Sequence, residues 1–179
     1  MNQSGQAYSS FRLLIAAIVA VAILGILVTI IMSAMGFITA NPLSETKSLL
    51  SELVGSPGAL KHTPEVVFKP DDVLAASALA ERLPIGKDQI CMSTGQFEED
   101  DLGGFKCLGC DGDDQHRIIY HGNSNRAAKI AVVCNVNLDE LKSDIDAYSL
   151  DFSEGNDIER ACDICEGKGK CCAVVLKRS

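Results

Sequence analysis

Cysteine is the residue type in this sequence with the widest chemistry, and the 179-residue chain contains eight cysteines. Cysteines form disulfide bonds, bind soft metal ions or act as redox-active thiols. All eight lie in the second half of the chain: Cys91, Cys107, Cys110, Cys134, Cys162, Cys165, Cys171 and Cys172. An even number confined to one segment is typical of disulfides formed in an oxidising compartment. We therefore predict that all eight are disulfide-bonded, with pairings that the sequence does not give.

Metal binding is the alternative chemistry, because the cysteines include two C-x-x-C pairs. One pair is Cys107 and Cys110, the other is Cys162 and Cys165, and zinc and iron–sulfur sites use this spacing. The two pairs lie much farther apart than the roughly 15–20 residues typical of zinc ribbons. Acidic residues beside both pairs disfavour the thiolate that redox catalysis needs. We therefore expect disulfides, with no metal and no cofactor, and keep a metal or redox site as the alternative.

The last two cysteines allow a more local prediction. Cys171 and Cys172 begin an apolar run that is typical of a strand, and neighbouring strand residues point to opposite faces of a sheet. These two cysteines should therefore bond to different partners. Only the segment 166–170, with two glycines, separates Cys165 from Cys171, and this connection is short enough to fold the strand back. We predict that at least one of the two bonds to Cys162 or Cys165.

Other groups with potential chemistry do not form a catalytic or metal-binding pattern. An EF-hand loop beginning at Asp111 would need glycine at its sixth position and glutamate at its twelfth, where this sequence has a histidine and a glycine. These acids, with those of residues 98–101, are predicted to form solvated loops. His62, His116 and His121 are predicted to be surface or strand-edge residues. We expect a protein that is not an enzyme.

Charge is distributed very unevenly along the chain. Residues 13–44 contain no charged side chain, whereas residues 45–179 contain 15 basic and 24 acidic residues, a formal charge of −9. Binding to nucleic acid requires a basic surface that neutralises phosphates, so we expect no nucleic-acid partner. The acidic segment is long enough to form one domain with its own core.

The charge-free run predicts a membrane segment. Residues 13–40 would form a helix about 42 Å long, compared with a hydrocarbon core of about 30 Å. We therefore expect three parts: a short polar N-terminal segment over residues 1–12, a single transmembrane helix over residues 13–40, and an acidic, cysteine-rich domain outside the cytoplasm over residues 41–179. Membrane lipid is then the first expected partner.

Small residues recur along this apolar segment with the helical period. They are Ala22, Gly25, Thr29, Ser33, Gly36 and Ala40. In lipid, helices associate by close backbone approach along such stripes, because hydrophobicity does not favour protein over lipid tails. The stripe predicts packing of this helix against copies of itself or against partner transmembrane helices.

The periodicity of the remaining sequence predicts an α+β domain. Helices are predicted over residues 44–54, 70–82, 137–148 and 157–165, and strands over residues 66–68, 89–93, 117–120, 129–136 and 171–176. The turn-forming residues 122–125 predict a hairpin between the strands on either side. We expect helices packed on a small antiparallel sheet of about four strands.

The N-terminal layout resembles an archaeal type IV pilin-like protein with a class III signal peptide. In that family a peptidase cuts before a glutamine that often follows a glycine, and Gly5-Gln6 matches this pair. Leu14 occupies the family's leucine position, whereas Tyr8 and Ser10 stand where the family has serine and glutamate. The resemblance covers roughly the first forty residues. It implies processing between Gly5 and Gln6 and bundling of the hydrophobic helices into a filament core.

These observations favour a structural or adhesive subunit of a pilus-like extracellular filament, anchored and assembled through its hydrophobic segment. The first alternative is a membrane-anchored accessory or binding module of a larger membrane complex, which shares every feature except self-assembly. The second is a membrane-tethered protein that binds metal or exchanges thiols through the two C-x-x-C pairs.

Overall fold

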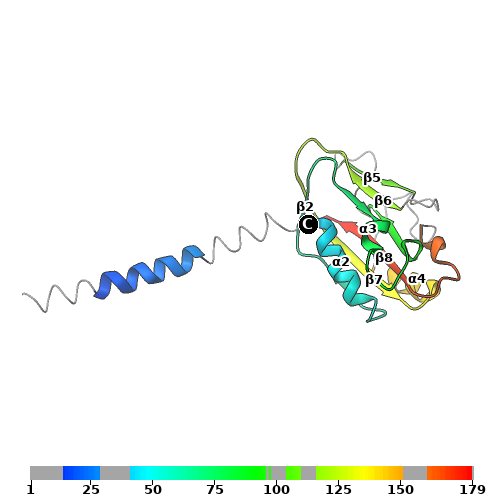
Figure 1. Ribbon diagram of the computed structural model, residues 1–179, viewed down its shortest axis with the longest axis horizontal. Helices are drawn as coiled ribbons and strands as arrows, with labels where there is room; N and C mark the ends of the chain where they lie inside the picture. The colour runs from blue at the N-terminus through cyan, green and yellow to red at the C-terminus, as the bar shows by residue number, and fades with distance from the viewer. Residues whose placement is uncertain are drawn as a thin grey trace, which may run out of the picture. The chain divides into compact units, whose positions relative to one another are not determined.

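The computed structural model describes residues 14–28, 41–95, 97, 104–109, 116–150 and 161–178. The chain separates into two compact units, Met1–Thr39 and Ala40–Ser179 (Figure 1). In the first unit, one helix covers residues 14–28, and every side chain of this helix is exposed.

The predicted transmembrane helix over residues 13–40 is wrong for the part of the chain that the structure describes. No helix there is long and apolar enough to cross a membrane.

The second unit is an α+β domain whose larger sheet is organised around one long strand, β7 (Arg126–Asn135). β1 (Leu60–His62) and β2 (Val66–Phe68) pair one after the other along one edge of β7, both antiparallel. β8 (Cys171–Lys177) pairs along the other edge, also antiparallel. β4 (Ile90–Ser93) then adds to β8 in parallel. The sheet therefore has five strands and is mixed, not purely antiparallel as predicted.

Thr63 joins β1 to β2 without interrupting the ladder along β7. Its backbone N–H donates to the Ile130 carbonyl at 2.8 Å, and its hydroxyl accepts from the Ile130 N–H at 2.9 Å. Thr63 is buried, so both backbone groups of Ile130 need a partner inside the protein. One threonine supplies both.

A second sheet of three antiparallel strands lies outside this ladder. Its order is β3 (Val73–Ala75), β6 (Arg117–Tyr120) and β5 (Phe105–Leu108). The predicted hairpin between the segment of β6 and that of β7 is wrong, because β3 and β5 occupy both edges of β6.

The predicted helix over residues 70–82 is also wrong. Its first half forms β3, which pairs with β6, and only α3 (Ala76–Ala80) is helical. Asp71 and Arg82 both have a φ of 67°, which is incompatible with an α-helix and limits the segment at both ends. Sheet pairing by Val73 and Leu74 outweighs the helical periodicity.

Two longer helices each begin at an asparagine cap. The second begins as predicted, whereas the first begins at Pro42, two residues before the predicted start at residue 44. The Asn41 side chain accepts from the Leu43 N–H at 2.9 Å and begins α2 (Pro42–Leu53). The Asn137 side chain accepts from the Glu140 N–H at 2.8 Å and begins α4 (Leu138–Ala147). Each cap satisfies one of the N–H groups that a helix end leaves without an internal partner.

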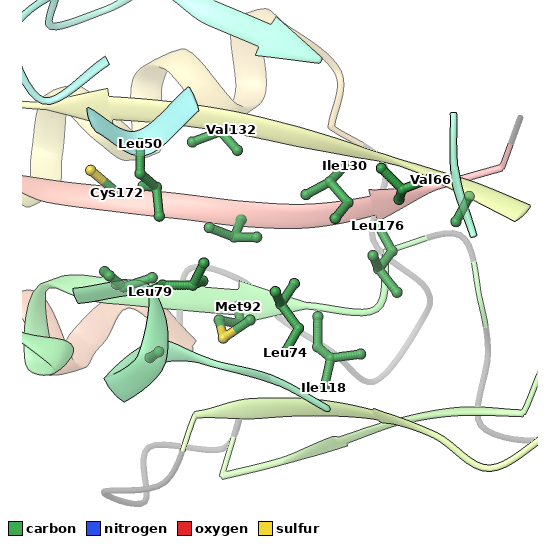
Figure 2. Close-up of a cluster of buried hydrophobic side chains, with 14 of the residues drawn as sticks. Leu50, Val66, Leu74, Leu79, Met92, Ile118, Ile130, Val132, Cys172 and Leu176 are labelled. Atoms are coloured by element: carbon green, nitrogen blue, oxygen red, sulfur yellow. The ribbon is translucent and has the colours of Figure 1, made fainter. Parts of the chain in front are cut away.

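Both faces of the five-stranded sheet are buried, so the domain has two hydrophobic cores. The first core lies between this sheet and the three-stranded sheet, with α2 and α3 alongside (Figure 2). It contains the alternate strand residues Ile130 and Val132 of β7 and Val174 of β8. The second core lies on the opposite face, where Ala131 and Val133 of β7 meet α4.

The two sheets share the first core, which predicts a large cost for removing a side chain between them. In a chain that begins at Asn41, Ile118→Ala should lower the free energy of unfolding by about 2–5 kcal/mol, because Ile118 is fully buried on β6. Val73→Ala, on the neighbouring strand β3, is the matched control. Val73 is 47% exposed, so that change should cost about 0.5 kcal/mol or less. Urea unfolding measures both, and equal costs would contradict a shared core.

Candidate functional site: a cluster of buried disulfides

Three disulfide bonds of the domain have both cysteines among the described residues. They are Cys91–Cys162, Cys134–Cys172 and Cys165–Cys171. Cys107 is disulfide-bonded as well, and none of the cysteines that the structure describes is free. Cys110 lies outside the described residues. The prediction of disulfides is therefore confirmed for seven of the eight cysteines.

The prediction for the two C-terminal cysteines is confirmed. Cys171 and Cys172 bond to different partners, because β8 directs them to opposite faces of the sheet. Cys172 belongs to the first core and bonds to Cys134, its direct neighbour across the β7–β8 ladder. Cys171 belongs to the second core and bonds to Cys165, as the short connection between them suggested.

The C-x-x-C pair of Cys162 and Cys165 is not a disulfide. Each of the two bonds to a strand cysteine instead, Cys162 to Cys91 on β4 and Cys165 to Cys171 on β8. A thioredoxin-like site needs the two cysteines of its C-x-x-C to bond to each other. The two cysteines therefore attach the short segment that contains them to two neighbouring strands.

Four of the cysteines form a single cluster in the second core, which we call the sulfur cluster: Cys91, Cys162, Cys165 and Cys171. The Sγ atoms of Cys91, Cys165 and Cys171 all lie within 4.8 Å of one another. Cys162 is bonded directly to Cys91, so the fourth Sγ adjoins the other three. All four side chains are at most 1% exposed. The sulfur cluster is therefore two buried disulfides side by side.

A tight turn returns the chain from Cys165 to β8. The 3₁₀ helix η2 (Asp163–Cys165) ends where the Glu166 N–H donates to the Asp163 carbonyl at 2.9 Å. The Lys168 N–H then donates to the Cys165 carbonyl at 3.0 Å. Gly167 and Gly169 have φ values of 70° and 81°, a region that favours glycine. These two glycines let five residues reverse the chain direction.

Polar contacts from another short helix, η1 (Lys87–Gln89), hold the same turn. The Gln89 side-chain amide donates to the carbonyls of Lys168 and Lys170 at 3.0 and 2.7 Å. The Lys168 ammonium lies 3.0 Å from the Asp88 carboxylate. Its hydrogen bond lowers the pKa of Asp88 below the ordinary value. Two disulfides thus hold the sulfur cluster covalently, and polar contacts from η1 hold the turn beside it.

A small cavity beside His116 was not predicted from the sequence. His116 is 3% exposed, so its prediction as a surface residue is wrong, whereas His62 and His121 are exposed. A cavity of about 210 Å³ beside it is lined by Val73, Ala75, Ala76, Ser77, Lys87, His116 and Arg117. The lysine and arginine would suit an anion, but the cavity is smaller than the roughly 300–1,000 Å³ of typical ligand pockets.

The other predicted site residues lie mostly outside the described part of the chain. Ala22 and Gly25 of the small-residue stripe lie on the exposed helix over residues 14–28. Thr29, Ser33, Gly36 and Ala40 lie outside the described residues, as do Gly5 and Gln6 and the acidic segments 98–101 and 111–114.

Comparison with known proteins adds no family. No protein-family model, curated protein or solved structure matches the chain. The class is therefore defined by the fold and the site alone: an α+β domain of two sheets, crosslinked by buried disulfides.

The bridges close loops of very different length, which predicts different costs of removal. Cys91–Cys162 spans 71 residues and Cys165–Cys171 spans 6. On the chain-entropy model, removing the first by Cys91→Ala with Cys162→Ala should cost about 4 kcal/mol. Removing the second by Cys165→Ala with Cys171→Ala should cost about 2 kcal/mol. Denaturant unfolding of both double variants measures this order.

Peptide mapping without reductant provides the control for this comparison. It should recover Cys91–Cys162, Cys134–Cys172 and Cys165–Cys171 from the unsubstituted protein. A peptide in which Cys162 and Cys165 bond to each other would contradict the pairing described here.

Proposed function

We propose that this protein is a structural or adhesive subunit of a pilus-like extracellular filament. In this proposal, apolar N-terminal helices of many copies pack together, and the disulfide-linked domains form the outer surface. The protein has no catalytic role in the proposal. The observation that carries it is the uncovered apolar helix over residues 14–28.

The exposure of this helix supports self-association. Large apolar side chains project from all around it, with Leu14, Val21, Ile26 and Leu27 each 49–70% exposed. An α-helix of this composition gains stability chiefly by burying its surface, so a partner that covers these side chains would stabilise it. Identical helices supply such a covering, since no charge on the segment opposes their approach.

The crosslinked domain supports a location outside the cytoplasm. Disulfides persist in oxidising compartments and are rare where thiols are kept reduced. Before assembly, we propose that membrane lipid covers the apolar segment. A subunit exposed on a filament surface gains from crosslinks, because they stabilise the domain without any ligand.

The alternative of an accessory module in a larger complex rests on the same apolar helix. There the covering would be helices of another protein. The two proposals differ in a measurable property, because only the first predicts assemblies that contain this chain alone.

Assembly should depend on the small-residue face of the helix. A Cβ added at Gly25 meets no atom within 4 Å in the chain by itself, so Gly25→Leu leaves the helix undisturbed and blocks only close approach by another helix. We expect a loss of filaments in electron micrographs of the native membrane fraction, with about 1 kcal/mol lost per close contact.

Ala16→Leu is the matched control for this substitution. Ala16 lies nine residues before Gly25, on the opposite side of the helix, and the substitution places the same leucine side chain there. Filaments should persist in this variant. Equal loss of filaments in both variants would contradict packing through the small-residue face, and a fixed complex with a different protein would favour the accessory module.

Processing gives an independent measurement. The pilin resemblance predicts cleavage between Gly5 and Gln6, so the intact mass of the mature protein should correspond to a chain that begins at Gln6. A mature chain that still begins at Met1 would contradict this processing.

A further inference from the structure

We propose that, once reduced, Cys91, Cys162, Cys165 and Cys171 form a tetrathiolate site for one Zn²⁺ ion. The structure brings these four sulfurs together in the second core as two neighbouring disulfides. The site differs from a site built on the two C-x-x-C pairs, because Cys107 packs against the first core, on the other face of the sheet.

The spacing of the sulfurs suits a tetrahedral ion. Zinc–sulfur bonds of about 2.3 Å place the four sulfurs of a tetrahedral site about 3.8 Å apart. Three of the sulfurs already lie within 4.8 Å of one another. In the oxidised protein Cys162 is bonded to Cys91. Reduction of that bond lets the two sulfurs separate to the distance that the ion requires.

The local sequence and burial suit a structural zinc site. Cys162 and Cys165 have the C-x-x-C spacing of a zinc knuckle, and the glycines of the following turn direct Cys171 back to the same centre. All four cysteines are at most 1% exposed, which leaves no position open to water and favours a closed site over a catalytic one.

The donor set selects the metal. Four thiolates favour a soft or borderline ion such as Zn²⁺ over Mg²⁺ or Ca²⁺, which prefer oxygen ligands.

The chemistry of the change is balanced. Two equivalents of a dithiol reduce the two disulfides, breaking both S–S bonds and delivering four electrons and four protons. Each dithiol is itself oxidised to a disulfide. Zn²⁺ then forms four Zn–S bonds and releases the four thiol protons to the solvent. A disulfide oxidant reverses the sequence and expels the ion.

The test uses the full-length chain in mild detergent, reduced with a dithiol without oxygen, incubated with zinc chloride and dialysed. One zinc per chain should remain by elemental analysis, and Co²⁺ in its place should give the visible absorption of a tetrahedral thiolate complex. The chain that was never reduced should retain no zinc. A reduced chain without zinc after dialysis would overturn the proposal.

Variants assign the ligands. Cys165→Ser and Cys91→Ser should each lose the zinc on dialysis, whereas Cys107→Ser, on the other face of the sheet, should keep it. Retention of zinc by Cys165→Ser, or its loss from Cys107→Ser alone, would overturn the assignment.

Thermal unfolding provides a second measurement that does not depend on any variant. Metal binding to a folded site stabilises the folded state, so zinc should raise the melting temperature of the reduced chain. A reduced chain that melts identically with and without zinc, or that is unfolded in both conditions, would overturn the proposal.

Discussion

The burial of both faces of one five-stranded sheet is the constraint on which the rest of the domain depends. Six consecutive residues of β8, from Cys171 to Leu176, are buried, so alternate side chains enter two separate cores. Each face therefore needs its own covering layer. The first face receives a second sheet with α2 and α3, whereas the second receives, among the described residues, α4, Leu150 and the short segment that contains η2. The two faces are covered very unequally.

Disulfides hold the smaller covering layer of the second face in place. The second core has fewer apolar residues than the first, and it contains four of the cysteines. A short segment such as residues 161–165 buries too little surface to hold itself against a sheet, since ordering each residue costs about 1–2 kcal/mol. Two crosslinks to neighbouring strands hold that segment, one to β4 and one to β8. The two disulfides are therefore part of the layer that covers the second face. They also place four sulfur atoms next to one another.

Local features of this fold were predictable from sequence and long-range features were not. The asparagine cap of α4 and the strands β2, β4, β6, β7 and β8 depend on local propensity, and the sequence indicated them. The bond from Cys165 to Cys171 was also within reach, because a short turn joins the two. The hairpin prediction and the helix over residues 70–82 were wrong, because pairing between β3 and β6 decided both. Cys91–Cys162 required knowledge of which strands lie side by side, and periodicity does not contain that information.

The need to cover apolar surface links the domain to the N-terminal helix. Within the domain, every large apolar face meets a sheet, a helix or a crosslinked segment of the same chain. The helix over residues 14–28 belongs to the other unit, and its apolar side chains are exposed on every side. A crosslink cannot solve this problem, because the segment contains no cysteine. We propose that another chain covers it, because a helix with small residues on one face and no charge accommodates a copy of itself at close range. In the proposed filament, self-assembly buries the apolar side chains of the N-terminal helix, as folding buries those of the domain.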